Sequence, residues 1–217
     1  SIVKLTANEG ASSFTMMFLR CGIAALILLP FALFGKYKKP KLKNPKFFLN
    51  GISPAQLLGF STSSSAATLP VTMERVEEHI GVDKEVSGFV LPVGATVNMD
   101  GTSLYQAVAA VFIAQAFGID LEFSDYIVII LTSTLASIGT AGVPGAGLIM
   151  LSLVLTTVGL PLEGLAIVAG IDRILDMART SVNVCGDLMV TILVGKSENE
   201  LDESIYNKAA SRLDKTA

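Results

Sequence analysis

Residues 171–187 read IDRILDMARTSVNVCGD, and they lie inside an apolar segment that runs from about 162 to 194. Each Asp or Arg at the centre of a membrane-spanning helix costs about 2.5 to 3.5 kcal/mol on insertion scales, so such residues usually mark the path of an ion or a substrate. At about 100° per residue, positions 172, 176, 179, 183 and 187 fall within an arc of about 80° of a helix. The sequence therefore predicts a spanning helix with one polar stripe.

The side chains of this stripe match the charged groups of an amino acid. Arg179 offers a fork for a carboxylate, Asp176 can accept from an ammonium, and Asn183 can donate to a second carboxylate. The alternative, open above all for Asp172 and Arg173, is that these charges only pair with one another between helices.

The composition places the chain in a membrane. Of its 217 residues, 51% are hydrophobic and 16% are charged, and the mean hydropathy is +0.61, whereas a soluble domain is about 25% charged. This balance excludes an ordinary soluble domain and a disordered chain. The net charge of −3 gives no basic surface, so we expect no nucleic-acid partner.

Side chains suited to covalent or metal chemistry are few. The chain has one histidine, His79, and two cysteines, Cys21 and Cys185, which excludes a disulfide framework and argues against a Cys/His metal site. The run Ser63–Ser65 has no lysine partner in the apolar segments, and His79 has no recognisable triad. We therefore predict that the protein is not an enzyme and has no cofactor.

The N-terminal region predicts the membrane topology. The apolar block from Phe14 to Phe34 can cross a hydrocarbon core of about 30 Å and lacks a cleavage site, so it is expected to be a retained span. Six lysines follow it, and the positive-inside rule makes this loop, 36–46, cytoplasmic. We expect a multi-pass protein of the cell (inner) membrane whose polar tail, 196–217, is also cytoplasmic.

Two segments fit helical hairpins that enter the bilayer and return to the same side. The segment 52–79 is too short for two crossings and is broken by serines and prolines. From Tyr126 to Leu162 there are 37 residues without a formal charge, too many for one span and too few for two. Its glycine-rich middle suggests two half-length helices, so we predict re-entrant hairpins at 52–79 and 126–160, with opposite entry.

Each predicted hairpin is followed by a polar-interrupted span, 86–118 with a break at Asn98–Thr102 and 162–194 with the stripe. This alternation predicts an inverted repeat whose broken segments meet at the membrane midplane. The expected fold is an all-α membrane protein with two re-entrant hairpins, two interrupted transmembrane helices and one N-terminal transmembrane helix. Closed hairpins and a stripe suited to a zwitterion favour a carrier over a channel.

Four motifs resemble the dicarboxylate/amino acid:cation symporter family, the glutamate transporters. They are Ser63–Ser65, Asn98–Thr102, Gly142–Gly147, and Asp176–Thr180 with Asn183 and Asp187. The similarity runs from about Ile52 to Val194. It implies sodium-coupled symport of an acidic amino acid, aspartate or glutamate, by an elevator-type transport domain, here residues 51–195. The family forms homotrimers, and we expect the trimer scaffold to be missing from this chain.

The resemblance also implies roles for individual residues in a substrate pocket. Arg179 and Thr102 would hold the side-chain carboxylate of the substrate, and Asp176 its amino group. Asn183, with Ser65, would hold the α-carboxylate. The pocket would be completed by the backbone near Ser63, Val143 and Gly147 and by the Thr180 hydroxyl.

Sodium is the coupling ion that the resemblance implies. A first ion would be bound by the carbonyls of Gly94, Asn98 and Asn183 and by the Asp187 carboxylate. A second would lie between Thr96, Met99, Ser137, Ile138 and Thr140, so that sodium binding and hairpin closure are coupled. Asp100 and the Asn98 side chain would contribute to a third.

Two positions refine the expected substrate and coupling. Arg179 matches the members that take acidic amino acids, and Gln106 stands where animal members that use protons and potassium have a glutamate, so no proton carrier is predicted there. Residues 1–50 instead resemble a span and loop of drug/metabolite transporters, and we expect them to have a separate origin. Two alternatives stay open: a non-transporting fragment or fusion product, and a proton-coupled dicarboxylate/amino acid carrier.

Overall fold

The computed structural model describes residues 45–205, and the helices and turns of this range include no β-strand. The β contacts in the same range are limited to one isolated bridge, between Val82 and Leu201. The predicted all-α class is confirmed for this part of the chain. The expected span 14–34, most of the lysine-rich loop 36–46 and the end of the tail 196–217 lie outside the described residues.

The first helix pair consists of α3 (Pro45–Thr62) and α4 (Ser65–Glu74), connected by a turn at Ser63–Ser64. Ser63 has a φ of 54°, in the left-handed region. The Oγ of Ser64 accepts a hydrogen bond from the Ala67 N–H at 3.1 Å and so caps α4. The serine run therefore ends one helix and begins the next.

The structure differs from the predicted hairpin 52–79 at its ends and in the cause of its break. α3 already begins at Pro45, and after α4 the chain continues as the π-helix η1 (Arg75–Ile80). Pro54 and Pro70 lie inside α3 and α4 and are exposed, so neither proline ends its helix. The serines alone interrupt this segment.

The second helix pair consists of α7 (Phe123–Ile138) and α8 (Ala146–Val158), joined by the glycine-rich turn 139–145. Gly145, with a φ of 80°, directly precedes α8. The two helices have 16 and 13 residues, fewer than the about 20 that a membrane span needs. Two short helices thus lie where the sequence predicted the hairpin 126–160.

Both longer segments are broken. α5 (Lys84–Val97) and α6 (Asp100–Ala116) are separated at Asn98–Met99, within the predicted span 86–118 and where the sequence predicted a break. The second interrupted span, expected at 162–194, forms α9 (Gly164–Ala169) and α10 (Asp172–Glu198), with a break whose position the sequence analysis did not predict. The interruption at Gly170–Ile171 reflects the low helix propensity of glycine, which the apolar pattern of the segment conceals.

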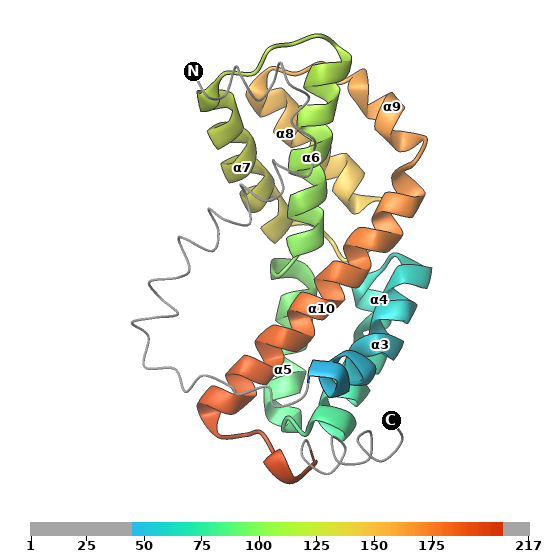
Figure 1. Ribbon diagram of the computed structural model, residues 1–217, viewed down its shortest axis with the longest axis vertical. Coiled ribbons are helices and arrows are strands. Elements are labelled where there is room, and N and C mark those ends of the chain that lie inside the picture. Colours follow the sequence, from blue (N-terminus) through green and yellow to red (C-terminus); the bar gives the residue numbers. More distant parts are fainter. Residues whose placement is uncertain (1–44, 206–217) are drawn as a thin grey trace.

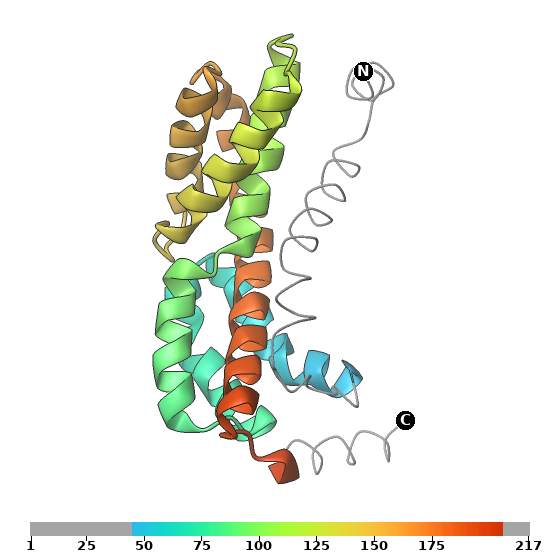
Figure 2. The same ribbon diagram turned by 90° about the vertical axis from the view of Figure 1, so that its left-hand side faces the viewer.

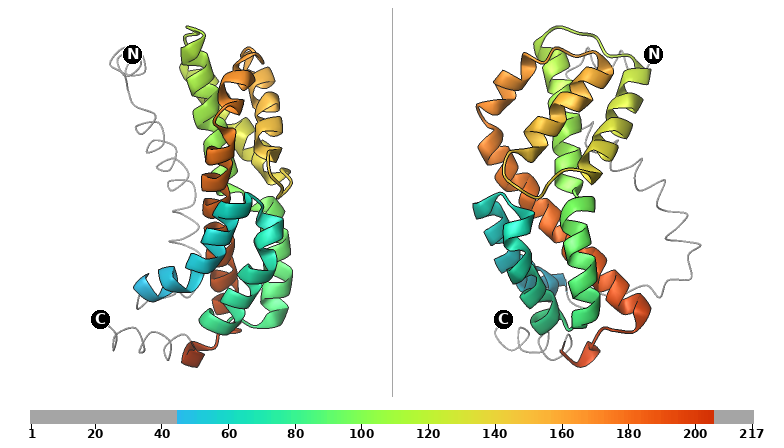
Figure 3. Two further views of the ribbon diagram at one scale, coloured as in Figure 1. Left: turned by 90° about the vertical axis from the view of Figure 1, so that its right-hand side faces the viewer. Right: turned by 180° about the vertical axis from the view of Figure 1, so that it is seen from behind.

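The two helix pairs lie in opposite halves of the molecule. Figure 1 shows α10 crossing the molecule diagonally beside α5 and α6, with α3 and α4 in the lower half and α7 and α8 in the upper half. Seen from behind in Figure 3, the connecting turns of the two pairs face each other near the middle. Buried apolar side chains form two separate clusters, one among α6, α7, α8 and α9 and one among α3, η1, α5 and α10.

Apolar side chains face outward and polar ones inward. On α7, Leu131 and Leu135 are 58% and 70% exposed, whereas Ser133 and Ser137 are buried. This inversion of the usual soluble pattern suits a lipid environment. By length and composition, α10 is the one described helix apolar enough to cross a membrane, and α7 and α8 are shorter apolar helices.

Candidate functional site

The turns of both helix pairs, the start of α6 and the polar stripe of α10 converge on one place. They enclose a cavity of about 10 Å³, room for about one water. All nine residues that the sequence predicted to hold a substrate line it, together with Met99, Thr140, Ala141 and Gly142. These nine are Ser63, Ser65, Thr102, Val143, Gly147, Asp176, Arg179, Thr180 and Asn183.

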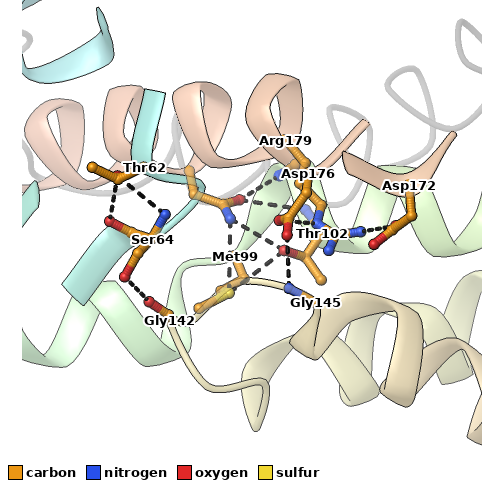
Figure 4. Close-up of polar contacts among 11 residues, drawn as sticks. Thr62, Ser64, Met99, Thr102, Gly142, Gly145, Asp172, Asp176 and Arg179 are labelled. Carbon is orange, nitrogen blue, oxygen red and sulfur yellow. Dashed lines mark hydrogen bonds and ion pairs between the residues drawn. The ribbon is translucent and has the colours of Figure 1, made fainter. Parts of the chain in front are cut away.

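Arg179 lines this cavity and is bound by two carboxylates of its own helix. Its Nε donates to Asp176 Oδ1 at 2.9 Å and its Nη1 to Asp172 Oδ1 at 3.2 Å (Figure 4). The guanidinium also lies over the Tyr105 ring, 4.4 Å from its centre. Its Nη2 is buried and has no hydrogen-bond partner within residues 45–205, so one donor of the fork remains free for a further acceptor.

Some charges of the polar stripe pair with one another, as the alternative interpretation expected, and others do not. Asp172 is buried and engaged with Arg179. Arg173 is exposed, and its Nη2 donates to the Ser61 carbonyl at 3.4 Å. Two carboxylates against one guanidinium leave the buried cluster with a formal charge of −1, a charge that an ammonium can neutralise.

Asp176 connects the stripe to the second helix pair. Its Oδ2 accepts a hydrogen bond from the Gly145 N–H at 2.7 Å, while its Oδ1 accepts from Arg179. Since Gly145 immediately precedes α8, the same carboxylate holds both the guanidinium and the turn in place. The side chain expected to bind an amino group is thus also the fastening point of the turn.

The turns of the two helix pairs contact each other directly at Gly142. Ser64 Oγ donates to the Gly142 carbonyl at 2.7 Å, and the Ala66 N–H donates to the same oxygen at 3.2 Å (Figure 4). A Cβ on Gly142 would lie 3.0 Å from the Ala95 carbonyl oxygen, so a side chain there would push the turns apart. The sequence analysis treated Ser64 as part of the run Ser63–Ser65, and it did not predict that one of these serines connects the two turns.

Asn183 is more fully engaged than the sequence suggested. Its Oδ1 accepts from the N–H groups of Gly101 at 2.8 Å and Thr102 at 3.3 Å, and its Nδ2 donates to Thr102 Oγ1 at 3.1 Å. The amide therefore satisfies the first donors of α6. Thr102 and Asn183 were each expected to hold a different carboxylate of the substrate, and here they are bonded to each other. A substrate carboxylate therefore reaches Asn183 only by exchanging one of these bonds.

Tyr105 and Asp172 were missed as site residues. Tyr105 follows Thr102 by three positions on α6, which places both on one helix face, and the face of its ring supports Arg179. Asp172 belongs to the same stripe as Asp176 and Arg179. A helical projection of both helices would have shown the two residues beside the predicted pocket.

The residues expected for the first sodium come together between α5 and α10. Asn98 Nδ2 donates to Asp187 Oδ1 at 3.0 Å, and Gly94 accepts from the Asn98 N–H at 2.8 Å. A Cβ on Gly94 would lie 2.7 Å from Asp187 Oδ1, so only glycine permits this approach. Asn183 lies one helical turn before Asp187 on the same face. The donor set, a carboxylate with amide and carbonyl oxygens, fits a hard monovalent cation.

The residues expected for the second and third sodium are less closely gathered. Met99, Ser137 and Thr140 are buried, whereas Thr96 is exposed and Ile138 is 44% exposed. The backbone carbonyls of these five residues would be the ligands of the second ion. Asp100 is exposed, and its Oδ2 would lie 3.1 Å from a Cβ on Gly186. Within residues 45–205, no three His, Cys, Asp or Glu side chains cluster as a metal site.

Gln106 lies one turn after Thr102 on α6 and is fully buried. Its amide nitrogen and oxygen have no hydrogen-bond partner among the described residues. The absence of a proton carrier at this position stays a prediction.

Comparison with known proteins gives a family match and close relatives. The model of the sodium:dicarboxylate symporter family matches residues 2–197. An excitatory amino acid transporter of Caenorhabditis elegans is 50% identical over 181 residues, 83% of this chain and 35% of its own length. Human excitatory amino acid transporter 2 is 52% identical over 161 residues, 74% of this chain and 28% of its own. Rat excitatory amino acid transporter 1 is 50% identical over 165 residues, which make up 76% of this chain and 30% of its own length.

Two conclusions follow from these matches. The relatives are transporters and not enzymes, in agreement with the sequence prediction. The family match begins at residue 2, so it includes the N-terminal segment and gives no support to the separate origin expected for residues 1–50. The chain spans about a third of the length of these curated relatives.

Proposed function

Since the chain belongs to the sodium:dicarboxylate symporter family, we propose that it contains the substrate-binding part of a secondary transporter that moves an acidic amino acid together with sodium. The observation that carries the proposal is the buried Arg179, whose Nη2 is free of partners within the described residues while Nε and Nη1 are bound. A carboxylate that reaches Nη2 gains a charged hydrogen bond without first displacing another.

The proposed binding sequence follows from the charges around Arg179. The substrate side-chain carboxylate meets Arg179 and Thr102, and the guanidinium is drawn away from Asp176. Asp176 then has a free oxygen for the substrate ammonium. The α-carboxylate meets Asn183 and the Ser65 region, where the left-handed Ser63 supplies backbone and a buried hydroxyl without a partner among the described residues. Aspartate and glutamate carry the two carboxylates and one ammonium that this set requires.

The cavity is too small for an amino acid, so binding requires the turns to separate. We propose that the turn 139–145 moves, because three hydrogen bonds fasten it to the rest of the site and each can be exchanged for a bond to water or to a ligand. They join the turn to Ser64, Ala66 and Asp176. Substrate binding at Asp176 competes directly with the bond to Gly145.

Sodium is proposed to be the coupling ion. The ligands would be the Asp187 carboxylate and the carbonyls of Gly94, Asn98 and Asn183, and hydrogen bonds donated by Asn98 to Asp187 and to Gly94 hold part of this set together. Ser137, Ile138 and Thr140 stand at the end of α7 and the start of the moving turn, so a cation bound to their carbonyls would favour the closed turn. Sodium and substrate would then bind together, which is the requirement for symport.

We further propose the membrane arrangement. The pairs α3–α4 and α7–α8 would be re-entrant hairpins of opposite entry, each followed by an interrupted span, α5–α6 and α9–α10, as an inverted repeat. Residues 51–195 would move as an elevator-type domain against a scaffold, in a homotrimer as the family resemblance implies. The loop 36–46 and the tail would be cytoplasmic.

Calorimetric titration of L-aspartate into the purified chain, with and without sodium, tests this proposal. We expect binding that requires sodium, is lost in Arg179→Ala and is kept in Arg173→Ala, the exposed arginine six positions earlier. Binding that depends on pH and not on sodium would favour a proton-coupled carrier instead. Absence of binding, or binding that Arg179→Ala retains, would contradict the proposed site. Sodium-driven uptake into proteoliposomes that contain only this chain would show transport itself.

A further inference from the structure

A thioether lies in the candidate site, and the proposed function uses only the backbone of its residue, Met99. This residue directly precedes α6, is 3% exposed and lines the small cavity. Figure 2 shows the break between α5 and α6, both green, near the middle of the molecule and level with the turn 139–145. The other methionines that the structure describes are half-buried and do not line the cavity; they are Met73, Met150, Met177 and Met189.

Two hydrogen-bond donors are directed at the Met99 sulfur. Thr102 Oγ1 donates to it at 3.5 Å and Asn183 Nδ2 at 3.7 Å (Figure 4). The Asn183 amide is held in this orientation, because its Oδ1 accepts from the N–H groups of Gly101 and Thr102. A thioether is a weak acceptor, so both donors would bind an oxygen more strongly than they bind this sulfur.

The cavity beside the sulfur has space for one oxygen atom. Its volume of about 10 Å³ holds about one water, and the oxygen of a methionine sulfoxide needs a similar space. Oxidation makes the apolar side chain polar, and the new oxygen can accept from Thr102 and Asn183. These are the two side chains expected to hold the carboxylates of the substrate. The sulfoxide oxygen would therefore take the place of a substrate oxygen.

We propose that Met99 is a site of reversible oxidation by peroxides, and that its sulfoxide blocks the substrate pocket. A lone pair of the sulfur attacks one oxygen of the peroxide, the O–O bond breaks and an S–O bond forms. The sulfur is oxidised by two electrons and the peroxide is reduced by two. The leaving oxygen takes the proton and departs as water or as an alcohol. Methionine sulfoxide reductases reverse the change.

Access of a peroxide to this sulfur rests on the proposed movement of the turn 139–145. A peroxide contains two oxygen atoms, whereas the closed cavity holds about one water, so Met99 reacts only while the turns are apart. Sodium and an acidic amino acid fill the pocket and favour the closed turn, so they protect the sulfur. If Met99 only fills space in the core, its oxidation is slow with and without these ligands.

Peptide mass spectrometry of the full chain in nanodiscs, treated with hydrogen peroxide, tests the modification site. Without ligand we expect a sulfoxide at Met99, and sodium with L-aspartate should lower its rate of formation by about tenfold, because the open population falls. Met150 and Met189 lie outside the cavity, and their oxidation rates should not change. The proposal is overturned if both controls are oxidised and Met99 is not, or if a chain that binds aspartate gives Met99 no protection.

Calorimetry of the treated chain measures the effect on binding. We expect the Kd for L-aspartate to rise by about tenfold, the loss of one hydrogen bond to a charged group, and methionine sulfoxide reductases to restore it. Whatever its affinity before treatment, Met99→Leu should not respond to peroxide, whereas Met150→Leu should respond as the wild type does. An affinity that is unchanged by the sulfoxide at Met99 would contradict the proposal. A chain that forms this sulfoxide but never binds aspartate would support the modification site and contradict the proposed function.

Discussion

The backbone N–H of Gly145 donates to Asp176 Oδ2 at 2.7 Å, which fastens the turn before α8 to the polar stripe of α10. The other oxygen of the same carboxylate accepts from Arg179 Nε at 2.9 Å. A ligand that occupies Asp176 therefore acts on the turn and on the guanidinium at once. In the proposed function, this shared carboxylate would link recognition of a substrate to movement of the turn.

Substitution of Asp176 separates these two roles. Asp176→Asn retains an oxygen for the Gly145 N–H but loses the charge that would receive the substrate ammonium, so we expect aspartate binding to weaken by about tenfold or more, the cost of one charged hydrogen bond. Asp176→Ala also releases the turn, which should become sensitive to protease. Calorimetry and limited proteolysis of residues 139–145 measure the two effects. Equal protease sensitivity of both variants would show that Asp176 does not fasten the turn.

Gly147 allows Arg179 to take its position. A Cβ at this residue would lie 2.7 Å from Arg179 Cζ, so Gly147→Ala must displace the guanidinium. We expect the dissociation constant for aspartate to rise by between about 10-fold and 100-fold, as for a misplaced binding group. The matched control is Gly88→Ala, because a Cβ there meets nothing within 4 Å. Unchanged affinity in Gly147→Ala would remove Arg179 from the binding step.

Asn183 stabilises the start of α6. Asn183→Ala leaves the Gly101 and Thr102 N–H groups without their acceptor, and we expect a loss of about 1 to 2 kcal/mol in the free energy of unfolding. Asn183→Asp keeps the acceptor and places a negative charge at a helix N-terminus, where it is favourable. Thermal unfolding in detergent should therefore rank Asn183→Asp close to the wild type and Asn183→Ala below it. The reverse order would rule out capping as the main role.

Asp187 is expected to determine the sodium requirement. Asp187→Asn removes the one carboxylate of the ligand set proposed for the first sodium, so a sodium concentration about tenfold higher should be needed for half-maximal aspartate binding. Affinity at saturating sodium should change little, because Asp187 does not line the cavity. Asp120→Asn, at an exposed carboxylate outside the site, serves as the control. An unaltered sodium titration in Asp187→Asn would place the coupling ion elsewhere.

The sequence was most informative where one local rule decides the structure. The serines at 63–65 and the Asn98–Met99 pair end helices through their own side-chain and backbone chemistry, and the glycine-rich turn 139–145 follows from chain flexibility. The family resemblance identified the nine cavity residues, which come from four distant segments. Neither periodicity nor composition would have grouped these nine residues into one site.

What could not be predicted depends on tertiary contacts. α3 and α4, which pack against each other and against α10, continue through the exposed Pro54 and Pro70, and the break at Gly170–Ile171 has no strong local signal. The pairing of Arg179 with Asp172 and Asp176, and of Asn183 with the start of α6, depends on how α6 and α10 cross. Gly101 permits that crossing, since a Cβ there would lie 2.3 Å from the Arg179 carbonyl oxygen.

The two apolar clusters stay separate, and the contact between the two turns that lies between them is made by polar groups. Parting the turns at Gly142 therefore exposes little apolar surface, and it exchanges hydrogen bonds worth about 1 kcal/mol each for bonds to water or to a ligand. We therefore expect the proposed open arrangement to lie within a few kcal/mol of the closed one, about 1 kcal/mol for each exchanged hydrogen bond. A single bound ion or amino acid is enough to reverse their populations.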